Sequence, residues 1–359
     1  MNNSSAPVAV IGGGQSGLAA ARAVRDAGLR PVVLEAGDRP AGSWPHYYDS
    51  LTLFSPARFS ALAGVPFPGD PDHYPRRDEV TAYLQRFAAD LGVEIRTGAR
   101  VESVTADGAG FLVRTADGRC LPAAGVVAAT GSFSNPHLPQ VAGSEGFAGR
   151  SLHVADYRHP APYAGQRVVV VGAGNSAVQV AHELASVATV TLATREPVRF
   201  LPQRRAGRDL HHWLRVTGFD RLPAAWLTRF VDGALVLDTG RYARALASGR
   251  LDRRPVFTAL EERGVVWADG SRERIDAVIW ATGYRPAVGY LSGLGALRPD
   301  GSPRHDGGVS TTRPGLVYLG LEFQRSFSSN TLRGVARDAE HVVSALAAHV
   351  RGAVAAAGL

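Results

Sequence analysis

The chain has 359 residues, of which 45% are hydrophobic and 20% charged, as expected for one large or two medium globular domains. No apolar run is long enough to span a bilayer, so we expect a cytoplasmic protein without a membrane partner. The single cysteine, Cys120, excludes an intramolecular disulfide and a redox-active cysteine pair, and all 39 basic residues are arginines, which excludes chemistry that needs a lysine.

The first predicted element is a strand over residues 8–11, which meets a glycine-rich turn and then an apolar helix. The turn has the pattern GxGxxG: the first glycine permits the tight turn, the second lets a pyrophosphate approach, and the third lets helix and strand pack closely. The next strand ends in an acid, where a carboxylate can bind a ribose 2′-hydroxyl. The predicted cofactor-binding residues here are Gly12, Gly14, Ser16, Gly17 and Glu35.

Helix and strand signals then alternate along the first half. A helix is predicted over 78–91, where apolar residues recur at helical spacing. Hairpin turns at 107–108 and 117–118 predict a β-meander, which leads into a buried strand over 125–129. This strand stops at a small turn, where a parallel strand would face its ligand. We therefore expect cofactor contacts at Ala129, Thr130 and Gly131.

The second half repeats this order. A strand over 168–171 meets a GxGxxA turn, and the following strand ends in Arg195, a residue type suited to the 2′-phosphate of NADPH. Glu196 follows it directly, so NADH can also be accepted. A later strand, over 276–280, again ends in Ala-Thr-Gly. The predicted NADPH-binding residues are Gly172, Gly174, Asn175, Ser176, Arg195, Ala281, Thr282 and Gly283.

These repeats predict an α/β fold of two Rossmann-like dinucleotide-binding domains, each with three layers (ββα), the second domain being inserted in the first. The expected boundaries are 1–157 and 283–359 for the first domain and 158–282 for the second, with crossings at 158–162 and 283–286. The end of the chain is expected to add a strand over 317–320 and a helix over 330–348. In a flavin domain, the N-terminus of this helix would face the flavin ring.

An arginine-rich helical excursion is expected over about 200–250. Residues 195–254 contain 13 arginines and only six acidic residues, so this stretch is strongly basic. Attraction of a polyanionic cofactor, or a solvated helical face, explains this charge better than nucleic acid, for which no binding module is present. His211 and His212 lack metal-ligand spacing and are expected at the surface, so no metal site is predicted.

Residues 147–157 read FAGRSLHVADY and match FxGxxxHxxxY. With two flanking glycine motifs, the whole chain resembles the class B flavin-dependent monooxygenases, and most closely the short bacterial flavin-containing monooxygenases. The resemblance implies FAD in the first domain, NADPH in the second and a possible homodimer. It places further cofactor contacts at Gly42, Ser43, Trp44, Val101 and Gly320.

The resemblance also implies an activity. Hydride would pass from NADPH to the flavin, O2 would give a C4a-hydroperoxide, and a small S- or N-containing soft nucleophile, such as a thioether, would take up one oxygen atom. Two residues are candidates for catalytic roles: the fingerprint histidine His153, and Phe54, which replaces an Asn that larger members place beside the flavin. A flavin reductase or oxidase that passes electrons to a quinone or O2, and a non-enzymatic NADP(H) sensor, are the alternatives.

Overall fold

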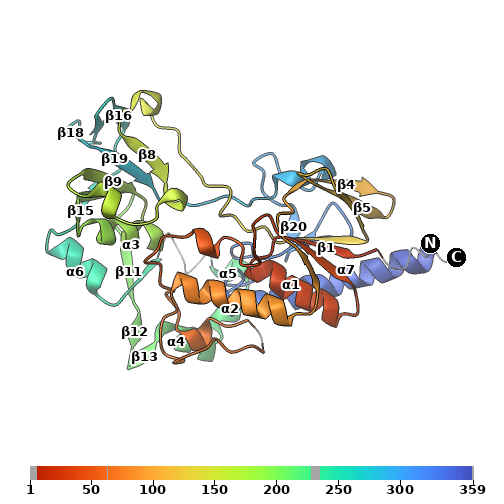
Figure 1. Ribbon diagram of the computed structural model, residues 1–359. Helices are drawn as coiled ribbons and strands as arrows, with labels where there is room; N and C mark the ends of the chain where they lie inside the picture. The colour runs from red at the N-terminus through yellow and green to blue at the C-terminus, as the bar shows by residue number, and fades with distance from the viewer. Residues whose placement is uncertain (1–5, 63, 228–234, 358–359) are drawn as a thin grey trace.

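The computed structural model describes residues 6–62, 64–227 and 235–357. Two α/β domains lie side by side and are joined by extended segments (Figure 1). In each domain a sheet lies between helices on one face and a small antiparallel sheet on the other. The predicted fold class, two Rossmann-like domains with the second inserted in the first, is confirmed. Within the described ranges, no helix is both long and apolar enough to cross a membrane.

The first domain is built on a seven-stranded sheet of order β20-β21-β22-β7-β1-β2-β3. Its five strands from β22 to β3 are parallel, and β20 and β21 add an antiparallel edge. Strands from both ends of the chain share this sheet, so the second domain is an insertion. The strands are β1 (Val8–Ile11), β2 (Pro31–Leu34), β3 (Glu94–Arg96), β7 (Gly125–Ala128), β20 (His305–Asp306), β21 (Val309–Ser310) and β22 (Leu316–Tyr318).

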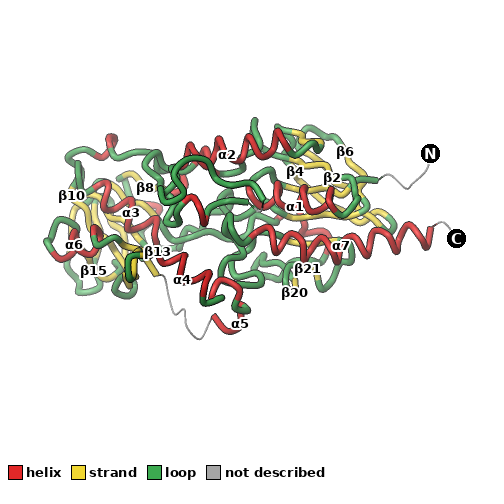
Figure 2. Tube along the Cα trace, turned by 90° about the horizontal axis from the view of Figure 1, so that it is seen from below, coloured by secondary structure: helices red, strands yellow, loops and turns green. Residues whose placement is uncertain are grey.

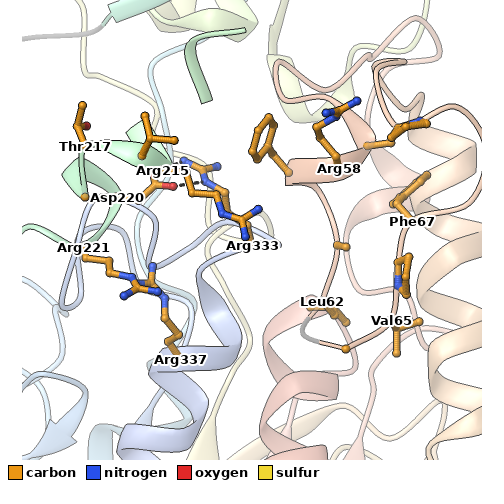
Figure 3. Close-up of a pocket in the computed structure, with 18 residues that line it drawn as sticks. Arg58, Leu62, Val65, Phe67, Arg215, Thr217, Asp220, Arg221, Arg333 and Arg337 are labelled. Atoms are coloured by element: carbon orange, nitrogen blue, oxygen red, sulfur yellow. Dashed lines mark hydrogen bonds and ion pairs between the residues drawn. The ribbon is translucent and has the colours of Figure 1, made fainter. Parts of the chain in front are cut away.

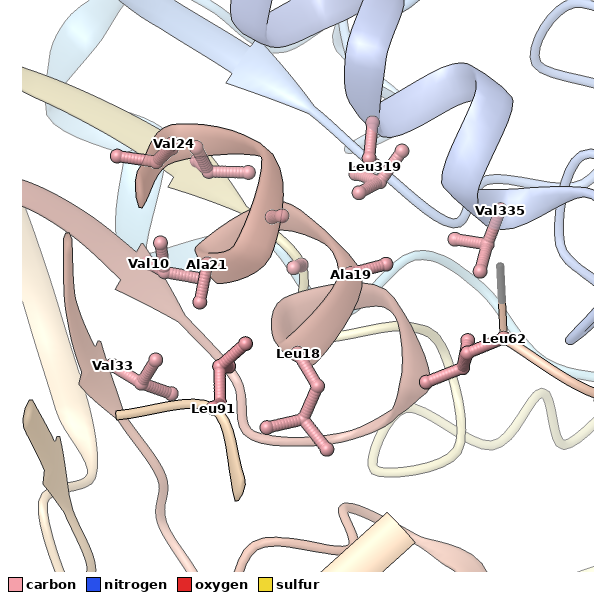
Figure 4. Packing of buried hydrophobic residues seen from close by; sticks show 14 of the residues in the cluster. Val10, Leu18, Ala19, Ala21, Val24, Val33, Leu62, Leu91, Leu319 and Val335 are labelled. Atoms are coloured by element: carbon pink, nitrogen blue, oxygen red, sulfur yellow. The ribbon is translucent and has the colours of Figure 1, made fainter. Parts of the chain in front are cut away.

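The layers follow from the alternation of side chains along β1. Val8 and Val10 pack against helices, whereas Ala9 and Ile11 pack against the meander. Because both faces are covered, the strand is apolar throughout. Figure 4 shows Leu18 in the helix-side core, where the first helix packs against both the sheet and the C-terminal helix. The helices are α1 (Gln15–Asp26), α2 (Arg77–Asp90) and α7 (Val335–Ala357), and the meander is β4 (Val101–Asp107), β5 (Gly110–Thr115) and β6 (Cys120–Ala123).

The C-terminal helix differs from its predicted bounds at both ends. The prediction over 330–348 begins too early, because backbone hydrogen bonds from Thr331 to Ser328 and from Gly334 to Thr331 form tight turns first. The helix then begins at Val335 and continues to Ala357. The helix predicted over 78–91 is confirmed as α2.

The second domain repeats the architecture on a parallel sheet of order β15-β10-β9-β19-β8. Its helix side is covered by α3 (Asn175–Leu184) and α6 (Arg241–Ala247), and its other side by a three-stranded antiparallel sheet. The parallel strands are β8 (Arg150–His153), β9 (Arg167–Val171), β10 (Thr189–Thr194), β15 (Asp252–Pro255) and β19 (Ala277–Trp280), and the antiparallel strands are β16 (Ala259–Glu261), β17 (Gly264–Val266) and β18 (Arg272–Arg274).

One of the two crossings between the domains differs from the prediction. Strand β8 pairs with β19, so the second sheet begins before the boundary expected after residue 157. The crossing expected at 158–162 is wrong, because this stretch follows β8 and lies within the second domain. The chain instead crosses over 131–137, antiparallel to 283–287, with backbone hydrogen bonds from His137 to Gly283 (3.0 Å) and from Arg285 to Asn135 (2.9 Å).

The arginine-rich excursion also contacts the first domain. Figure 2 shows α4 and α5 near the middle of the molecule, close to the start of α7. The Asp220 carboxylate accepts hydrogen bonds from the Arg333 guanidinium at 2.8 and 3.0 Å, and Ser328 Oγ donates to the Asp220 carbonyl at 3.0 Å. The excursion thus bridges both domains. Its described elements are β11 (Arg199–Pro202), β12 (Arg204–Arg205), β13 (Arg208–Asp209), α4 (Leu210–Val216), η7 (Phe219–Arg221), α5 (Ala224–Leu227) and β14 (Leu235–Asp238).

Candidate active site

The first glycine turn packs directly against the end of β7. Gly12 has a φ of +107°, and a Cβ added to it would lie 2.6 Å from the Ala129 carbonyl oxygen. A Cβ added to Gly17 would lie 1.7 Å from the Gly12 carbonyl oxygen. Because only glycine fits these positions, the turn presents bare backbone and the N-terminus of α1, which is what a pyrophosphate requires.

Glu35 is buried beside this turn. Its carboxylate accepts hydrogen bonds from the backbone N–H groups of Gly13 and Gly37, both at 2.6 Å. A carboxylate has further acceptor positions, so it can also bind ribose hydroxyls. Val101 begins β4 near the same end of the sheet, where the Ala99 N–H donates to the Glu35 carbonyl at 2.8 Å. These residues fit the adenosine half of FAD.

Two further glycines let other loops approach the turn closely. Gly42 has a φ of +57°, and an added Cβ would lie 2.7 Å from the Cα of Gly14. Gly320 has a φ of +88°, and its Cβ would lie 2.1 Å from Ser16 Oγ. The predicted residues Gly14, Ser16, Gly42 and Gly320 are therefore brought together around the N-terminus of α1.

The side chain of Gln15 joins two of the surrounding loops to the glycine turn by hydrogen bonds. Its Oε1 accepts a hydrogen bond from Trp44 Nε1 at 3.2 Å, and its Nε2 donates to the Asn330 carbonyl at 2.7 Å. Ser43 precedes Trp44 as the N-cap of η2 (Trp44–His46). Sequence patterns did not single out Gln15, although its place within the GxGxxG turn was the available signal.

The two Ala-Thr-Gly turns hold the crossing segments. Thr130 Oγ1 donates to the Ala287 carbonyl at 2.7 Å, and Thr282 Oγ1 donates to the His137 carbonyl at 2.5 Å. Each threonine thus contacts the segment on which the other turn lies. The glycines that follow, Gly131 and Gly283, have positive φ values and open space where a Cβ would lie, which leaves room for a cofactor.

The second glycine turn reproduces the close contact of the first. Gly172 has a φ of +142°, and an added Cβ would lie 2.3 Å from the Ala281 carbonyl oxygen. The Asn175 side-chain Oδ1 is buried without a hydrogen-bond partner among the described residues, so it is an acceptor for a bound ligand. Gly174 and Ser176 flank it at the start of α3. A dinucleotide such as NADPH fits this cradle.

Arg195 lies in the position expected for a phosphate-binding residue. It directly follows β10, and its side chain is exposed. No hydrogen bond or ion pair joins it to another residue that the structure describes. The guanidinium is thus available for a 2′-phosphate.

Phe54 lies at the boundary between the first domain and the excursion. Its ring is 40% exposed and stacks on the imidazole of His211, with ring centroids 6.0 Å apart. Its backbone carbonyl accepts a hydrogen bond from Gln203 Nε2 at 2.8 Å. The structure therefore holds the Phe54 backbone from the excursion while its ring remains accessible.

The prediction that His211 lies at the surface is wrong. Its side chain is 1% exposed and lies between Phe54 and Phe59, and its Nδ1 lies 2.7 Å from Asp209 Oδ1. The surrounding arginines indicated a solvated face, but docking of the excursion buries this side of α4. The acid two residues before the histidine was the signal that could have found this pair.

Asp209 is the centre of this partly buried polar network. Its Oδ2 accepts hydrogen bonds from Tyr74 (2.6 Å) and Gln203 (2.8 Å). Burial acts to raise the pKa of Asp209, but hydrogen bonds from His211, Tyr74 and Gln203 outweigh it and lower the pKa to about 2. The carboxylate therefore stays ionised and orients the His211 ring.

His153 is buried at the end of β8, next to the second Ala-Thr-Gly turn. Its Nδ1 accepts from the Ala155 N–H at 3.1 Å, so its Nε2 donates to the Gly283 carbonyl, also at 3.1 Å. Burial lowers the pKa of His153, which favours the neutral ring. With both ring nitrogens bonded to backbone, this arrangement supports a positioning role at the crossing.

Two glycine cradles, a buried acid at the first and an exposed arginine at the second define an oxidoreductase with sites for two dinucleotides. The chain belongs to the pyridine nucleotide-disulphide oxidoreductase family, whose model matches residues 9–226. Flavin monooxygenases of this family use FAD and NADPH, so the expected cofactors and enzyme class are confirmed.

Known relatives match over most of the chain. A flavin-containing monooxygenase from Stenotrophomonas maltophilia has 36% sequence identity and a TM-score of 0.84, covering 96% of this chain and 98% of its own. Indole-3-pyruvate monooxygenase YUCCA1 from Oryza sativa subsp. japonica is 34% identical over 80% of this chain and 79% of its own length. An uncharacterized CzcO-like oxidoreductase from Geobacillus kaustophilus is 30% identical, over 95% and 98% respectively. The expected resemblance to flavin-dependent monooxygenases is confirmed.

The family name refers to disulphide chemistry, but this chain has no second cysteine with which to form a redox-active pair. Cys120 is its single cysteine and is exposed on β6. Among the described residues, no group of three or more His, Cys, Asp or Glu side chains could hold a metal ion.

Arg195→Gln is expected to weaken NADPH use selectively. Loss of a charge-assisted contact to the 2′-phosphate, worth roughly 1.5–3 kcal/mol, corresponds to a rise in the KM for NADPH of about 10- to 150-fold. The KM for NADH should change little. Steady-state kinetics with both cofactors measure this, and Arg263→Gln, which removes an exposed arginine elsewhere in the same domain, is the control. Equal losses for NADPH and NADH would refute the assignment.

His153→Gln is expected to reduce the acid sensitivity of the fold. Because burial lowers the folded-state pKa of His153, the unfolded chain takes up the proton first as the pH falls. Stability is thus fully present above the unfolded pKa of about 6.5 and is lost as the pH falls through the lower folded value. The free energy of unfolding, measured with urea between about pH 7.5 and 5.5, should fall less in the variant. His46→Gln, at an exposed site, should behave like wild type; an unchanged slope in the His153 variant would contradict this explanation.

Proposed function

We propose that this oxidoreductase uses NADPH, FAD and O2 to transfer one oxygen atom to a small molecule that contains a nucleophilic sulfur or nitrogen, with thioethers as the preferred class. Bound flavin would supply the redox chemistry, accepting hydride from NADPH and activating O2. The residues of the chain would bind the two cofactors and exclude water from the space between them.

A row of aromatic rings carries this proposal. Neighbouring centroids lie 5.5 Å apart from Trp44 to Tyr47, 4.5 Å from Tyr47 to Phe133, 5.5 Å from Phe133 to Tyr284 and 4.8 Å from Tyr284 to His153. The row leads from the predicted flavin loop to the second Ala-Thr-Gly turn, and so connects the two cradles.

The chemistry of this row restricts the substrate. Burial raises the pKa values of Tyr47 and Tyr284, so both phenols stay neutral at physiological pH. Such a wall excludes water, which favours transfer of oxygen over release of peroxide. It offers no strong base to activate a weak nucleophile, so the substrate must be reactive in itself, as thioethers and amines are.

The test is the fate of isotopically labelled O2. Purified FAD-loaded protein, supplied with NADPH, ¹⁸O-labelled O2 and methyl p-tolyl sulfide, is expected to form a sulfoxide that carries one labelled oxygen atom. Mass spectrometry measures the product, and parallel assays measure NADPH consumed and hydrogen peroxide released. A second assay, with N,N-dimethylaniline in place of the sulfide, tests oxygenation at nitrogen. Stoichiometric peroxide, without an oxygenated product from either compound, would show that oxygen transfer is not the reaction.

One observation favours a second function, an NAD(P)H oxidase or flavin reductase. Phe54 exposes a hydrocarbon ring where larger relatives are expected to carry an asparagine, so residue 54 itself provides no side-chain amide to hydrogen-bond activated oxygen. Reduced flavin in such a site would pass its electrons to O2 or a quinone. The two functions differ in the fraction of NADPH that is converted into oxygenated product.

Phe54→Asn is expected to raise that fraction if the missing amide limits oxygen transfer. An amide can donate a hydrogen bond within the crevice, which the benzyl group cannot. The ratio of sulfoxide formed to NADPH consumed measures this effect. Phe54→Leu removes the ring without adding a donor and should leave the ratio near that of wild type. An equal rise in both variants would attribute the change to lost bulk.

A further inference from the structure

A large cavity lies between the first domain and the arginine-rich excursion. Its volume is about 1030 Å³, and it has two chemically different walls (Figure 3). The loop residues within 57–62 and 64–71 form one wall. Residues 215–221 of the excursion and the start of α7 form the other. The cavity is therefore assembled from segments far apart in the sequence.

The wall formed by the loop is mainly apolar. Phe59, Leu62 and Phe67 line it, each at most 7% exposed, so their positions are fixed by packing. Val65 and Pro66 extend the same surface. A ligand can bury hydrocarbon or an aromatic ring against this wall.

The opposite wall is strongly cationic. Five arginines line the cavity, and Asp220 is the acid found among its described lining residues. Two of the arginines have carboxylate partners: Arg58 pairs with Asp72 at 2.7 Å, and Arg333 pairs with Asp220 at 2.8 Å. The remaining three carry a charge that the cavity itself does not neutralise.

These three are Arg215, Arg221 and Arg337. The side chains of Arg215 and Arg221 are exposed and make no hydrogen bond or ion pair with another described residue. Arg337 donates to Ser328 Oγ at 2.8 Å. Figure 3 shows Arg221 and Arg337 next to each other on the cationic wall.

The placement of Arg337 has an electrostatic cost. Burial, and then repulsion by Arg221, lower the pKa of Arg337, while Asp220 and Asp338 offset part of this effect and Arg325 adds to it. Arg337 also lies in the first turn of α7, where the helix dipole disfavours a cation. A bound anion would relieve both unfavourable interactions.

We propose that this cavity binds an amphipathic carboxylate, with its anionic group at Arg215, Arg221 and Arg337 and its apolar part on the wall of Phe59 and Phe67. The cavity shares η3 (Ala57–Phe59) with the segment that positions Phe54. Resting on the proposed function, the inference is that the cavity selects the substrate: a thioether that also carries a carboxylate.

Binding is tested first, in the absence of NADPH. Isothermal titration calorimetry of FAD-loaded protein compares (benzylthio)acetate with (benzylthio)acetamide, which has the same apolar part without the charge. The carboxylate is expected to bind at least about tenfold more tightly, because charge-assisted hydrogen bonds exceed neutral ones by this order. Added salt should reduce the difference. Equal affinities would overturn the proposal.

Variants locate the site. The double variant Arg215→Gln/Arg221→Gln is expected to weaken carboxylate binding about tenfold and leave amide binding unchanged. Neither side chain makes a hydrogen bond or ion pair with another described residue, so folding should be preserved. Arg337→Gln should act in the same direction. The control, Arg86→Gln/Arg263→Gln, removes two exposed arginines outside the cavity; an equal loss in this control would show only a general effect of net charge.

Turnover separates this inference from the proposed function. In sulfoxide formation, the carboxylate should have a lower KM than the amide at similar kcat, and Arg215→Gln/Arg221→Gln should raise only the KM of the carboxylate. If the protein binds the carboxylate selectively but forms no sulfoxide, the carboxylate site is supported and its role in oxygenation is refuted. If both compounds give sulfoxide with equal KM and bind with equal affinity, the carboxylate site is refuted and the oxygenase activity is supported.

Discussion

Both cofactor sites depend on one backbone contact, repeated in each domain. The first glycine of each turn lies against the carbonyl of the facing Ala-Thr-Gly turn, where a Cβ would come within 2.6 Å at Gly12 and 2.3 Å at Gly172. A methyl group at either position would push β1 from β7, or β9 from β19. The helix N-terminus would then move away from the crevice, and the pyrophosphate would lose its backbone donors. In each domain, the distance between the glycine turn and the facing Ala-Thr-Gly turn is therefore possible only because the glycine has no side chain.

The features that local sequence determines were predicted well. Glycine turns between an apolar strand and a helix, the acid after β2 and the hairpin turns of the meander each reflect constraints within a few residues. Strand β8 was missed because it is short and its partner, β19, is distant in sequence. The crossing over 131–137 was missed for the same reason, since its hydrogen bonds go to 283–287. Non-local pairing leaves no periodic pattern in either segment.

His211 shows a different limit of the sequence. Its neighbours in the chain are polar or charged, and composition alone indicates a solvated helix. Its burial arises because the excursion docks on the first domain through Asp220 and Arg333, so that α4 faces Phe54 and Phe59. The aspartate two residues before it then becomes a buried partner. The environment of this side chain is therefore decided by tertiary contacts that single-sequence patterns do not contain.

The docked excursion also connects the two cofactor domains beside the cationic cavity. Strands β11 and β14 extend from the core of the second domain, where Val236 and Phe200 pack, whereas Asp220 is held by Arg333 of the first. The cationic wall therefore has contributions from both domains. The ion pair between Asp220 and Arg333 would have to break before Arg221 could separate from Arg337, so this pair keeps the cationic wall assembled.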